Sequence, residues 1–246
     1  RYNTVLTRFT KYMEQKDKKK TPQIAYFSME FGLSDTIKIY SGGLGLLAGD
    51  YLKEASDSNV NMVGVGFLYK YGYFTQQLSL KGEQLATYEA QNFSNLPVIP
   101  EKDENGNWRT IQVAFPGRIV VAKIWRVNVG RVPLFLLDTE IPENREEDRS
   151  ISHQLYGGDN EHRLKQEMLL GIGGMRALES LNIDADLYHC NEGHAALIGL
   201  ERLRRLITDE NLTFGESLEI VRASTLFTTH TPVQAGHDRS EDRRVG

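Results

Sequence analysis

Short apolar runs rich in β-forming residues alternate along this chain with longer segments whose apolar residues recur at helical spacing. The runs are Ile24–Met29, Val60–Leu68, Ala185–Cys190 and Thr225–Thr229. Such runs are typical of strands that are buried on both faces, which occur mainly in parallel sheets. The alternation therefore predicts an α/β fold, with a parallel sheet flanked by helices and connected by right-handed crossovers.

The pattern changes between residues 92 and 138. Asn105-Gly106 is a hairpin turn signal, and strand-like runs follow at Thr110–Phe115, Ile119–Val127 and Val132–Leu137. We expect antiparallel strands here, inserted in or flanking the parallel sheet. No linker or repeat divides the chain, so residues 1–246 are expected to form a single domain. Helices are predicted over 2–19, from about 46 to 58, and over 79–92, 160–178, 193–207 and 214–222, with a charged loop over 142–150.

Composition narrows the class of protein. Hydrophobic residues make up 40% of the chain and charged residues 25%, which is typical of a globular domain. The formal net charge is −4 and the basic residues are dispersed, which argues against a nucleic-acid partner. The single cysteine, Cys190, fits a reducing compartment and is expected to be an inert thiol. No apolar run approaches the ~20 residues that span a bilayer. We therefore expect a cytoplasmic protein without membrane contact.

The glycine-rich stretch Ser41–Asp50 lies between the first predicted strand and the helix that follows it. Gly42, Gly43 and Gly45 are expected just before the start of that helix. Backbone amides at a helix N-terminus favour anions, and glycines let a ligand approach the backbone closely. The stretch therefore has two interpretations, a phosphate-binding loop or a tightly packed turn, because glycines alone are weak evidence.

Polar residues follow the predicted strands. Glu30 follows the first strand, His189–His194 end or follow the third, and Thr229–Thr231 end or follow the last. Ligands of open parallel sheets bind beyond the carboxyl ends of the strands, so these residues and the glycine loop should share one rim. Each also has a structural interpretation. Glu30 could bond only the loop amides, His194 could pack at the start of a helix, and His230 could be a turn residue. Asn191 is expected to cap the following helix.

Several familiar chemistries do not fit. The chain has no Gly-x-Ser-x-Gly elbow and no Walker loop. Its His189, Glu192 and His194 do not form a His-Glu-x-x-His pattern, so no metal is expected. Gly43–Ala48 formally matches a dinucleotide fingerprint, but no acidic residue occurs in the region where the ribose partner should lie.

Six motifs occur in order along this chain. They are Tyr26-Phe27-Ser28-Met29-Glu30-Phe31, Gly42-Gly43-Leu44-Gly45, Tyr71-Gly72-Tyr73-Phe74, Arg163-Leu164-Lys165-Gln166-Glu167, Asn191-Glu192-Gly193-His194 and Thr229-His230-Thr231-Pro232. Together they resemble the N-terminal part of an α-glucan phosphorylase, which acts on glycogen, starch or maltodextrin. The form is similar to the shorter bacterial and archaeal enzymes.

The resemblance implies a glycosyltransferase of the GT-B type, with an active site between two Rossmann-like domains. This chain would be an incomplete N-terminal half. The implied reaction uses inorganic phosphate to remove a terminal α-1,4-linked glucose as glucose 1-phosphate, with retention. The implied cofactor is pyridoxal phosphate, which acts through its own phosphate group. The parent enzyme is expected to be a homo-oligomer.

The resemblance also assigns roles to individual residues. Gly42, Gly43 and Leu44 would offer backbone amides to the phosphates and the glucose, and the two glycines would also contact the cofactor. Glu30 would lie beside this loop and His194 would line the sugar pocket. His230 is the expected catalytic residue, which contacts the glucose and directs its carbonyl at the anomeric centre. Asn160 is a further expected sugar contact, on a loop that gates the site.

The cofactor lysine of this family, and its phosphate-binding lysine and arginine, lie in a C-terminal domain without a counterpart in this sequence. The segment Arg239–Gly246 also departs from the family pattern. We therefore expect no phosphorolysis by this chain alone. Two alternatives are a non-catalytic glucan-binding module of the same fold, and a nucleotide-sugar glycosyltransferase, which would need a donor-binding C-terminal half.

Overall fold

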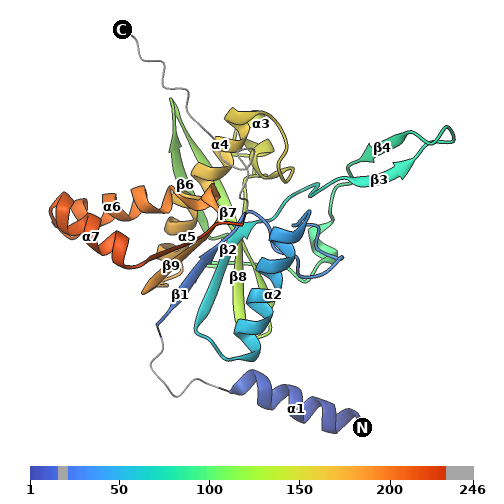
Figure 1. The fold of residues 1–246 in the computed structure, drawn as a ribbon, viewed down its shortest axis with the longest axis horizontal. Coiled ribbons are helices and arrows are strands. Elements are labelled where there is room, and N and C mark those ends of the chain that lie inside the picture. The colour runs from blue at the N-terminus through green and yellow to red at the C-terminus, as the bar shows by residue number, and fades with distance from the viewer. Residues whose placement is uncertain (16–21, 231–246) are drawn as a thin grey trace.

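An eight-stranded sheet runs through the centre of the computed structural model, which describes residues 1–15 and 22–230 (Figure 1). The strand order is β10-β9-β1-β2-β8-β7-β5, and β6 pairs with β7. The parallel part consists of β10 (Thr225–Thr228), β9 (Leu187–Asn191), β1 (Ile24–Phe27), β2 (Met62–Phe67) and β8 (Val132–Asp138). The expected α/β fold with a parallel sheet is confirmed.

The antiparallel part continues the same sheet. It is formed by β7 (Arg118–Val129), β6 (Thr110–Phe115) and β5 (Ile99–Pro100). Strand β8 belongs to both parts, because it runs parallel to β2 on one side and antiparallel to β7 on the other. The antiparallel strands therefore flank the parallel sheet at one edge instead of forming a separate layer.

Helices cover both faces of the sheet. On one face α2 (Gly43–Asp57) packs against β2 and β8, where Leu52 lies over Gly64. On the other face lie a π-helical turn, η3 (Leu169–Gly173), and the helices α5 (Gly174–Ser180) and α6 (Ile198–Thr208). A Cβ added to Gly174 would lie 2.8 Å from the Phe27 ring, so this glycine permits close packing on the sheet.

The remaining elements connect or extend these layers. Helix α7 (Phe214–Ala223) packs on α6 and begins with a capping box between Thr213 and Glu216. The other short elements are η1 (Phe93–Asn95), α3 (Glu146–Arg149), η2 (Ser150–Ser152), α4 (Asn160–Met168) and η4 (Gly193–Ala195). The segment 142–150, expected to be a loop, therefore includes one turn of helix.

The helix predicted over 79–92 is wrong. Strands β3 (Thr75–Leu78) and β4 (Gln84–Thr87) form a hairpin that projects from the body of the protein (Figure 1). The turn between them is set by Ser79, whose hydroxyl accepts from the amides of Lys81 and Glu83, and by Gly82, whose φ is +79°. This local turn chemistry overrides the helical spacing of the apolar residues.

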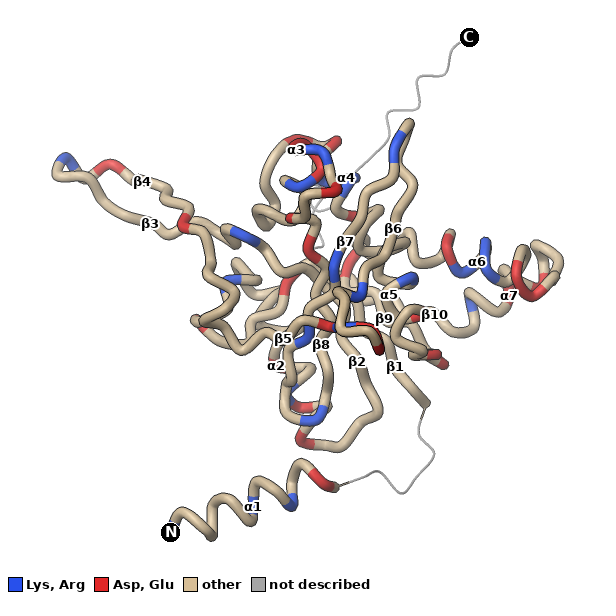
Figure 2. The backbone as a smooth tube through the Cα atoms, turned by 180° about the vertical axis from the view of Figure 1, so that it is seen from behind, with Lys and Arg blue, Asp and Glu red and all other residues tan. Residues whose placement is uncertain are grey.

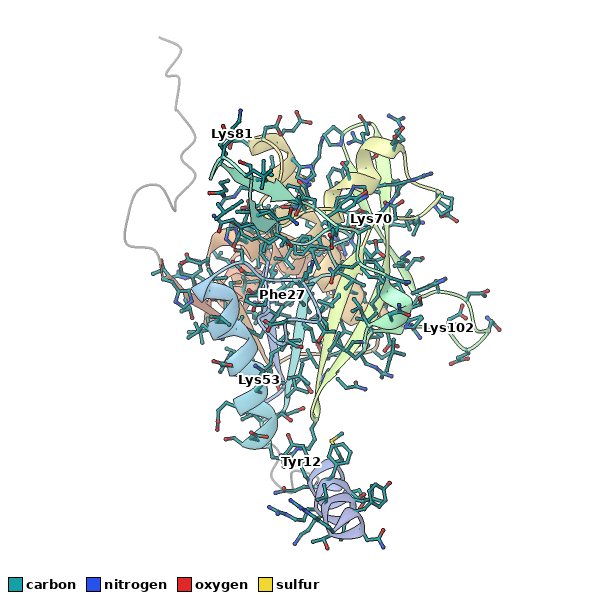
Figure 3. The ribbon with its side chains drawn as sticks, turned by 90° about the vertical axis from the view of Figure 1, so that its right-hand side faces the viewer. Tyr12, Phe27, Lys53, Lys70, Lys81 and Lys102 are labelled. Atoms are coloured by element: carbon teal, nitrogen blue, oxygen red, sulfur yellow. The ribbon has the colours of Figure 1, made fainter. Side chains whose placement is uncertain are left out.

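Helix α1 (Tyr2–Glu14) lies apart from the sheet and makes contact near its end (Figures 1 and 3). The Tyr12 hydroxyl donates to Asp57 at 2.9 Å and the Arg131 guanidinium stacks on the Tyr12 ring. The predicted helix extends to residue 19, but residues 16–21 lie outside the described part. Acidic and basic residues are interspersed along the backbone (Figure 2). Within the described residues, no helix is both long and apolar enough to cross a bilayer.

Candidate functional site

The carboxyl ends of β1, β9 and β10 meet at one rim of the sheet, because these strands are adjacent and parallel. Glu30 follows β1, Glu192 and His194 follow β9, and His230 follows β10. Hydrogen bonds connect residues of this rim to one another and to the start of α2, as described below. The shared rim predicted from the sequence is therefore present in the structure.

The N-terminus of α2 opens on this rim. The helix begins at Gly43, so Gly43 and Gly45 lie in its first turn. The sequence-based expectation that both precede the helix is therefore wrong. Gly42 is the N-cap, has an extended backbone and provides no side-chain cap. The amides of the first turn have no acceptor within a helix, so those of Gly43, Leu44 and Gly45 point out of the N-terminus.

The glycines of this stretch serve two different purposes. A Cβ added to Gly42 or Gly43 would meet no atom within 4 Å, so the space beside the first amides is open. A Cβ on Gly45 would lie 2.6 Å from the Glu30 carboxylate, and one on Gly49 would lie 2.1 Å from the carbonyl oxygen of Gly32. The first pair leaves room for a ligand, and the second pair permits close packing.

Glu30 is 2% exposed and bonds the glycine loop. Its Oε2 accepts from the Ser41 amide at 2.7 Å, the Ser41 hydroxyl at 3.3 Å and the Gly42 amide at 3.4 Å. These donors and the nearby helix N-terminus offset the cost of burying a carboxylate. The Glu30 carboxylate therefore bonds the amides of the glycine loop, as the structural interpretation of this residue predicts.

Tyr156 completes the surroundings of Glu30 and was missed by the sequence analysis. Its hydroxyl donates to Glu30 Oε1 at 2.7 Å, and its ring centroid lies 5.9 Å from that of His194. Burial, followed by the charge of Glu30, raises the pKa of Tyr156 well above its ordinary value, so the hydroxyl remains a donor. The only signal in the sequence is an aromatic residue before the pair Gly157-Gly158.

Asn191 links β1, β9 and β10. It lies inside β9 and does not cap a helix, contrary to expectation, because both ends of its buried side-chain amide are used elsewhere. Its Nδ2 donates to the Ser28 hydroxyl at 3.1 Å, and its Oδ1 lies 2.7 Å from His230 Nε2. Because an amide oxygen only accepts hydrogen bonds, His230 Nε2 is the donor in this contact.

Glu192 has a backbone conformation that almost only glycine adopts, with φ +63° and ψ −171°. Residues held in such regions cost about 1–3 kcal/mol each and cluster at functional sites. Here the conformation accompanies a contact between strands, since Glu192 Oε1 accepts from the His230 amide at 2.5 Å. His230 is therefore positioned through both its ring and its backbone.

His194 is buried at the start of η4, and its Nδ1 lies 3.4 Å from Oε1 of Glu167, the penultimate residue of α4. Glu167 Oε1 also lies 3.6 Å from Arg163 Nε. Asn160 lies at the opposite end of α4, where it is exposed, and Asp159 caps the helix. Among the described residues no hydrogen bond joins Asn160 to the rim.

His189 and Cys190 do not join this group. His189 bonds the Thr228 hydroxyl at 2.6 Å and packs against the rings of Tyr26 and Tyr51. Cys190 is buried, and burial raises the pKa of its thiol to about 11. The described part of the chain contains no cluster of at least three His, Cys, Asp or Glu side chains arranged to hold a metal ion.

Comparison with known proteins finds relatives across nearly the whole chain. It is 48% identical to a glycogen phosphorylase of Mycobacterium tuberculosis, over 96% of this chain and 29% of that protein. It is 44% identical to a maltodextrin phosphorylase of Thermococcus litoralis, over 97% of this chain and 29% of the relative. For a glycogen phosphorylase of Aquifex aeolicus the identity is 42%, over 95% of this chain and 33% of the relative.

A family model described as a protein of unknown function (DUF3417) matches residues 1–37. The chain spans about three-tenths of the length of the curated relatives it matches. The resemblance read from the motifs is confirmed by these relatives, and this chain is homologous to the N-terminal portion of the α-glucan phosphorylases.

Proposed function

We propose that this chain supplies one wall of a site in which inorganic phosphate cleaves the terminal α-1,4-linked glucose of glycogen, starch or maltodextrin. The products are glucose 1-phosphate and a shortened glucan, with retention at the anomeric carbon. The observation that carries the proposal is the open N-terminus of α2 on the same rim as Glu30 and His230. The names of the relatives, glycogen and maltodextrin phosphorylase, support the reaction.

The amides of Gly43 and Leu44 bind the substrate phosphate. They lie in the first turn of α2, where the helix dipole favours anions, and the bare Cα atoms of Gly42 and Gly43 let an oxyanion approach them. Glu30 holds the preceding amides and so fixes the loop without occupying those of the helix. Preorganised donors of this kind stabilise developing negative charge at little cost at the moment of reaction.

His230 acts on the sugar. Its amide bond to Glu192 and its ring bond to Asn191 support this role because they fix the residue. We assign its carbonyl oxygen to the anomeric carbon. A fixed carbonyl dipole stabilises the oxocarbenium-like charge that develops at that carbon. His194 lines the sugar pocket beside Tyr156, and Asn160 adds a sugar contact from the first position of α4.

The open space beside Gly42 and Gly43, where an added Cβ would meet no atom within 4 Å, also leaves room for the phosphate group of pyridoxal phosphate. Gly42 and Gly43 would contact this cofactor. When bound, this cofactor would supply a phosphate group for proton exchange at the substrate phosphate. We further propose that the parent enzyme has two Rossmann-like domains, is a homo-oligomer and is cytoplasmic.

The test measures release of glucose 1-phosphate from maltodextrin and inorganic phosphate. We expect none from this chain alone. We expect activity when the chain replaces the matching segment in the Mycobacterium tuberculosis glycogen phosphorylase. In that fusion, Gly43→Ala places a methyl group in the open cradle and should lower kcat/KM on the order of 100-fold, because small misplacements of reacting groups are costly.

Gly215→Ala is the matched control, since its Cβ would also meet nothing within 4 Å but lies in α7. It should leave kcat/KM unchanged. Thermal unfolding of the Gly43→Ala fusion at a temperature no lower than that of the unchanged fusion shows that the substitution acts on the site and not on the fold. Product release by the chain alone, or full activity of the Gly43→Ala fusion, contradicts the proposal.

A further inference from the structure

A cavity of about 380 Å³ lies at the antiparallel edge of the sheet. It falls within the size range of small-molecule sites. Lys70 and Lys102, both labelled in Figure 3, lie beside this cavity. Lys70 forms an ion pair with Glu140, which lines the cavity, and Lys102 forms a β-bridge with Trp108. The lining residues are Trp108, Thr110, Gln112, Val121, Lys123, Glu140, Ile141, Pro142 and Glu143.

Strand register explains why the cavity is there. Thr110 lies opposite Lys123, and Gln112 lies opposite Val121, so all four side chains emerge on one face of β6 and β7. The alternate residues of β6, such as Ile111 and Val113, face the other side and pack near Gly173 of η3. The segment 140–143, which follows β8, forms the remaining wall of the cavity.

Trp108 is the largest side chain of this cavity and is held in place. Its ring meets that of Trp125 edge-on at 4.8 Å, and the Lys123 ammonium lies 5.3 Å from its centroid. Trp125 in turn donates its indole N–H to Asp138 at 3.0 Å. The Trp108 side chain nevertheless remains 39% exposed, against 9% for Trp125. A fixed and exposed indole at the edge of a cavity is a preorganised stacking surface.

The charges around the cavity cancel in pairs. Lys123 lies 3.2 Å from Asp138 and donates to the carbonyl of Glu140 at 3.0 Å. The Glu140 carboxylate pairs with Lys70 at 3.2 Å and with His153 at 2.5 Å. Among the lining residues this leaves Glu143 as the other charged group, beside the neutral Thr110 and Gln112. The lining therefore suits a neutral ligand rich in hydroxyl groups and disfavours phosphates.

We propose that this cavity is a second glucan-binding site, in which a glucosyl ring stacks its C–H face on Trp108 and its hydroxyls bond Thr110, Gln112 and Glu143. Aromatic faces carry partial negative charge and attract such polarised C–H groups. The choice of an α-glucan rests on the proposed function. Strands β2, β8 and β7 separate β6 from β1, which places the cavity roughly 20 Å along the sheet from the phosphate cradle at ~4.8 Å per strand.

Titration of the chain with maltoheptaose, followed by tryptophan fluorescence, tests the proposal. The chain has only two tryptophans, so a saturable change in emission reports on this cavity. We expect a Kd on the order of 1 mM, which is ordinary for a small neutral ligand, and at least about tenfold weaker binding by Trp108→Ala in calorimetry. Gln112→Ala is expected to weaken binding with an intact indole.

Tyr88→Ala is the matched control, because it removes an exposed aromatic side chain that does not line the cavity. It should bind maltoheptaose as the unchanged chain does. A chain that shows no saturable binding, or one whose binding is lost in His230→Ala but kept in Trp108→Ala, overturns the proposal. The phosphorolysis assay is independent, since the Gly43→Ala fusion tests the cradle whatever Trp108 does.

If Trp108→Ala does not fold, oxidation of the unchanged chain by N-bromosuccinimide gives the same answer. Trp108 is the more exposed tryptophan and should react first. Maltoheptaose should slow this reaction, whereas inorganic phosphate should not. Equal oxidation rates with and without maltoheptaose contradict the proposal.

Discussion

The residues of the rim show what a sequence can reveal at the scale of single side chains. Glu30 and His230 could be placed on a common rim because each follows an apolar run that reads as a buried strand. Tyr156 could not, since its contact with Glu30 joins two residues that are 126 positions apart in the chain. The strained backbone of Glu192 is equally hidden, because nothing in its sequence requires a positive φ.

His189 is expected to make stability depend on pH. Its buried ring lies against Tyr26 and Tyr51, and burial followed by the charge of His230 lowers its pKa below the ordinary 6.5. The unfolded chain then binds a proton before the folded one as the pH falls. The contribution of His189 is therefore present above about pH 6.5 and is lost as the pH falls from there toward the folded pKa.

His189→Gln keeps a polar partner for Thr228 and removes the titration. Between about pH 7.5 and about pH 5.5, we expect its free energy of unfolding in urea to fall by less than that of the unchanged chain, by at most about 1.4 kcal/mol per pH unit. Burial also lowers the pKa of His162. Both proteins contain His162, so its effect on the pH dependence of stability cancels when the two profiles are compared. Parallel pH profiles of the two proteins would show that His189 does not contribute.

At the scale of elements, the prediction succeeds for segments whose structure follows from the spacing of their apolar residues. It fails for segments whose structure is determined by turn residues. The strands of the parallel sheet were found because each is an apolar run with few alternatives. The segment 79–92 was misread because helical spacing can arise by chance in a hairpin whose residues are exposed on both faces. Its turn residues, Ser79 and Gly82, carried the contrary signal.

The close packing around the glycines of the η3–α5 segment can be tested by substitution. A Cβ on Gly171 would lie 2.8 Å from the Leu197 Cβ and 2.9 Å from the Ile198 amide, where backbone cannot yield cheaply. Gly171→Ala should therefore destabilise the chain by about 1–3 kcal/mol through overpacking. Gly215→Ala, in open space on α7, should instead stabilise it by up to about 1 kcal/mol through helix propensity.

Chemical unfolding with guanidinium, monitored by circular dichroism, measures both effects. The two substitutions are chemically identical, so the difference between them reports the space around each Cα. A Gly171→Ala variant as stable as the unchanged chain would mean that α6 can move away from η3. The packing assigned to these glycines would then be wrong.

At the scale of the whole molecule, the sheet ends differently at its two sides. The antiparallel side is finished by β6 and β5, which pair with β7. On the other side, β10 pairs with β9 alone among the described residues, and it has Leu226 and Phe227 half-exposed on opposite faces. An exposed apolar strand of this kind is a template for pairing with another chain.

We therefore expect this chain to self-associate with rising concentration through β10. Phe227→Lys places a charge on the strand and should shift the sedimentation profile toward the monomer, since charged residues on an edge oppose strand pairing. Leu200→Lys is the matched control, because it introduces the same charge at an exposed apolar residue of α6. If both substitutions suppress association equally, net charge and not the strand edge controls it. If neither does, the association uses another surface, such as the exposed apolar stripe of α1.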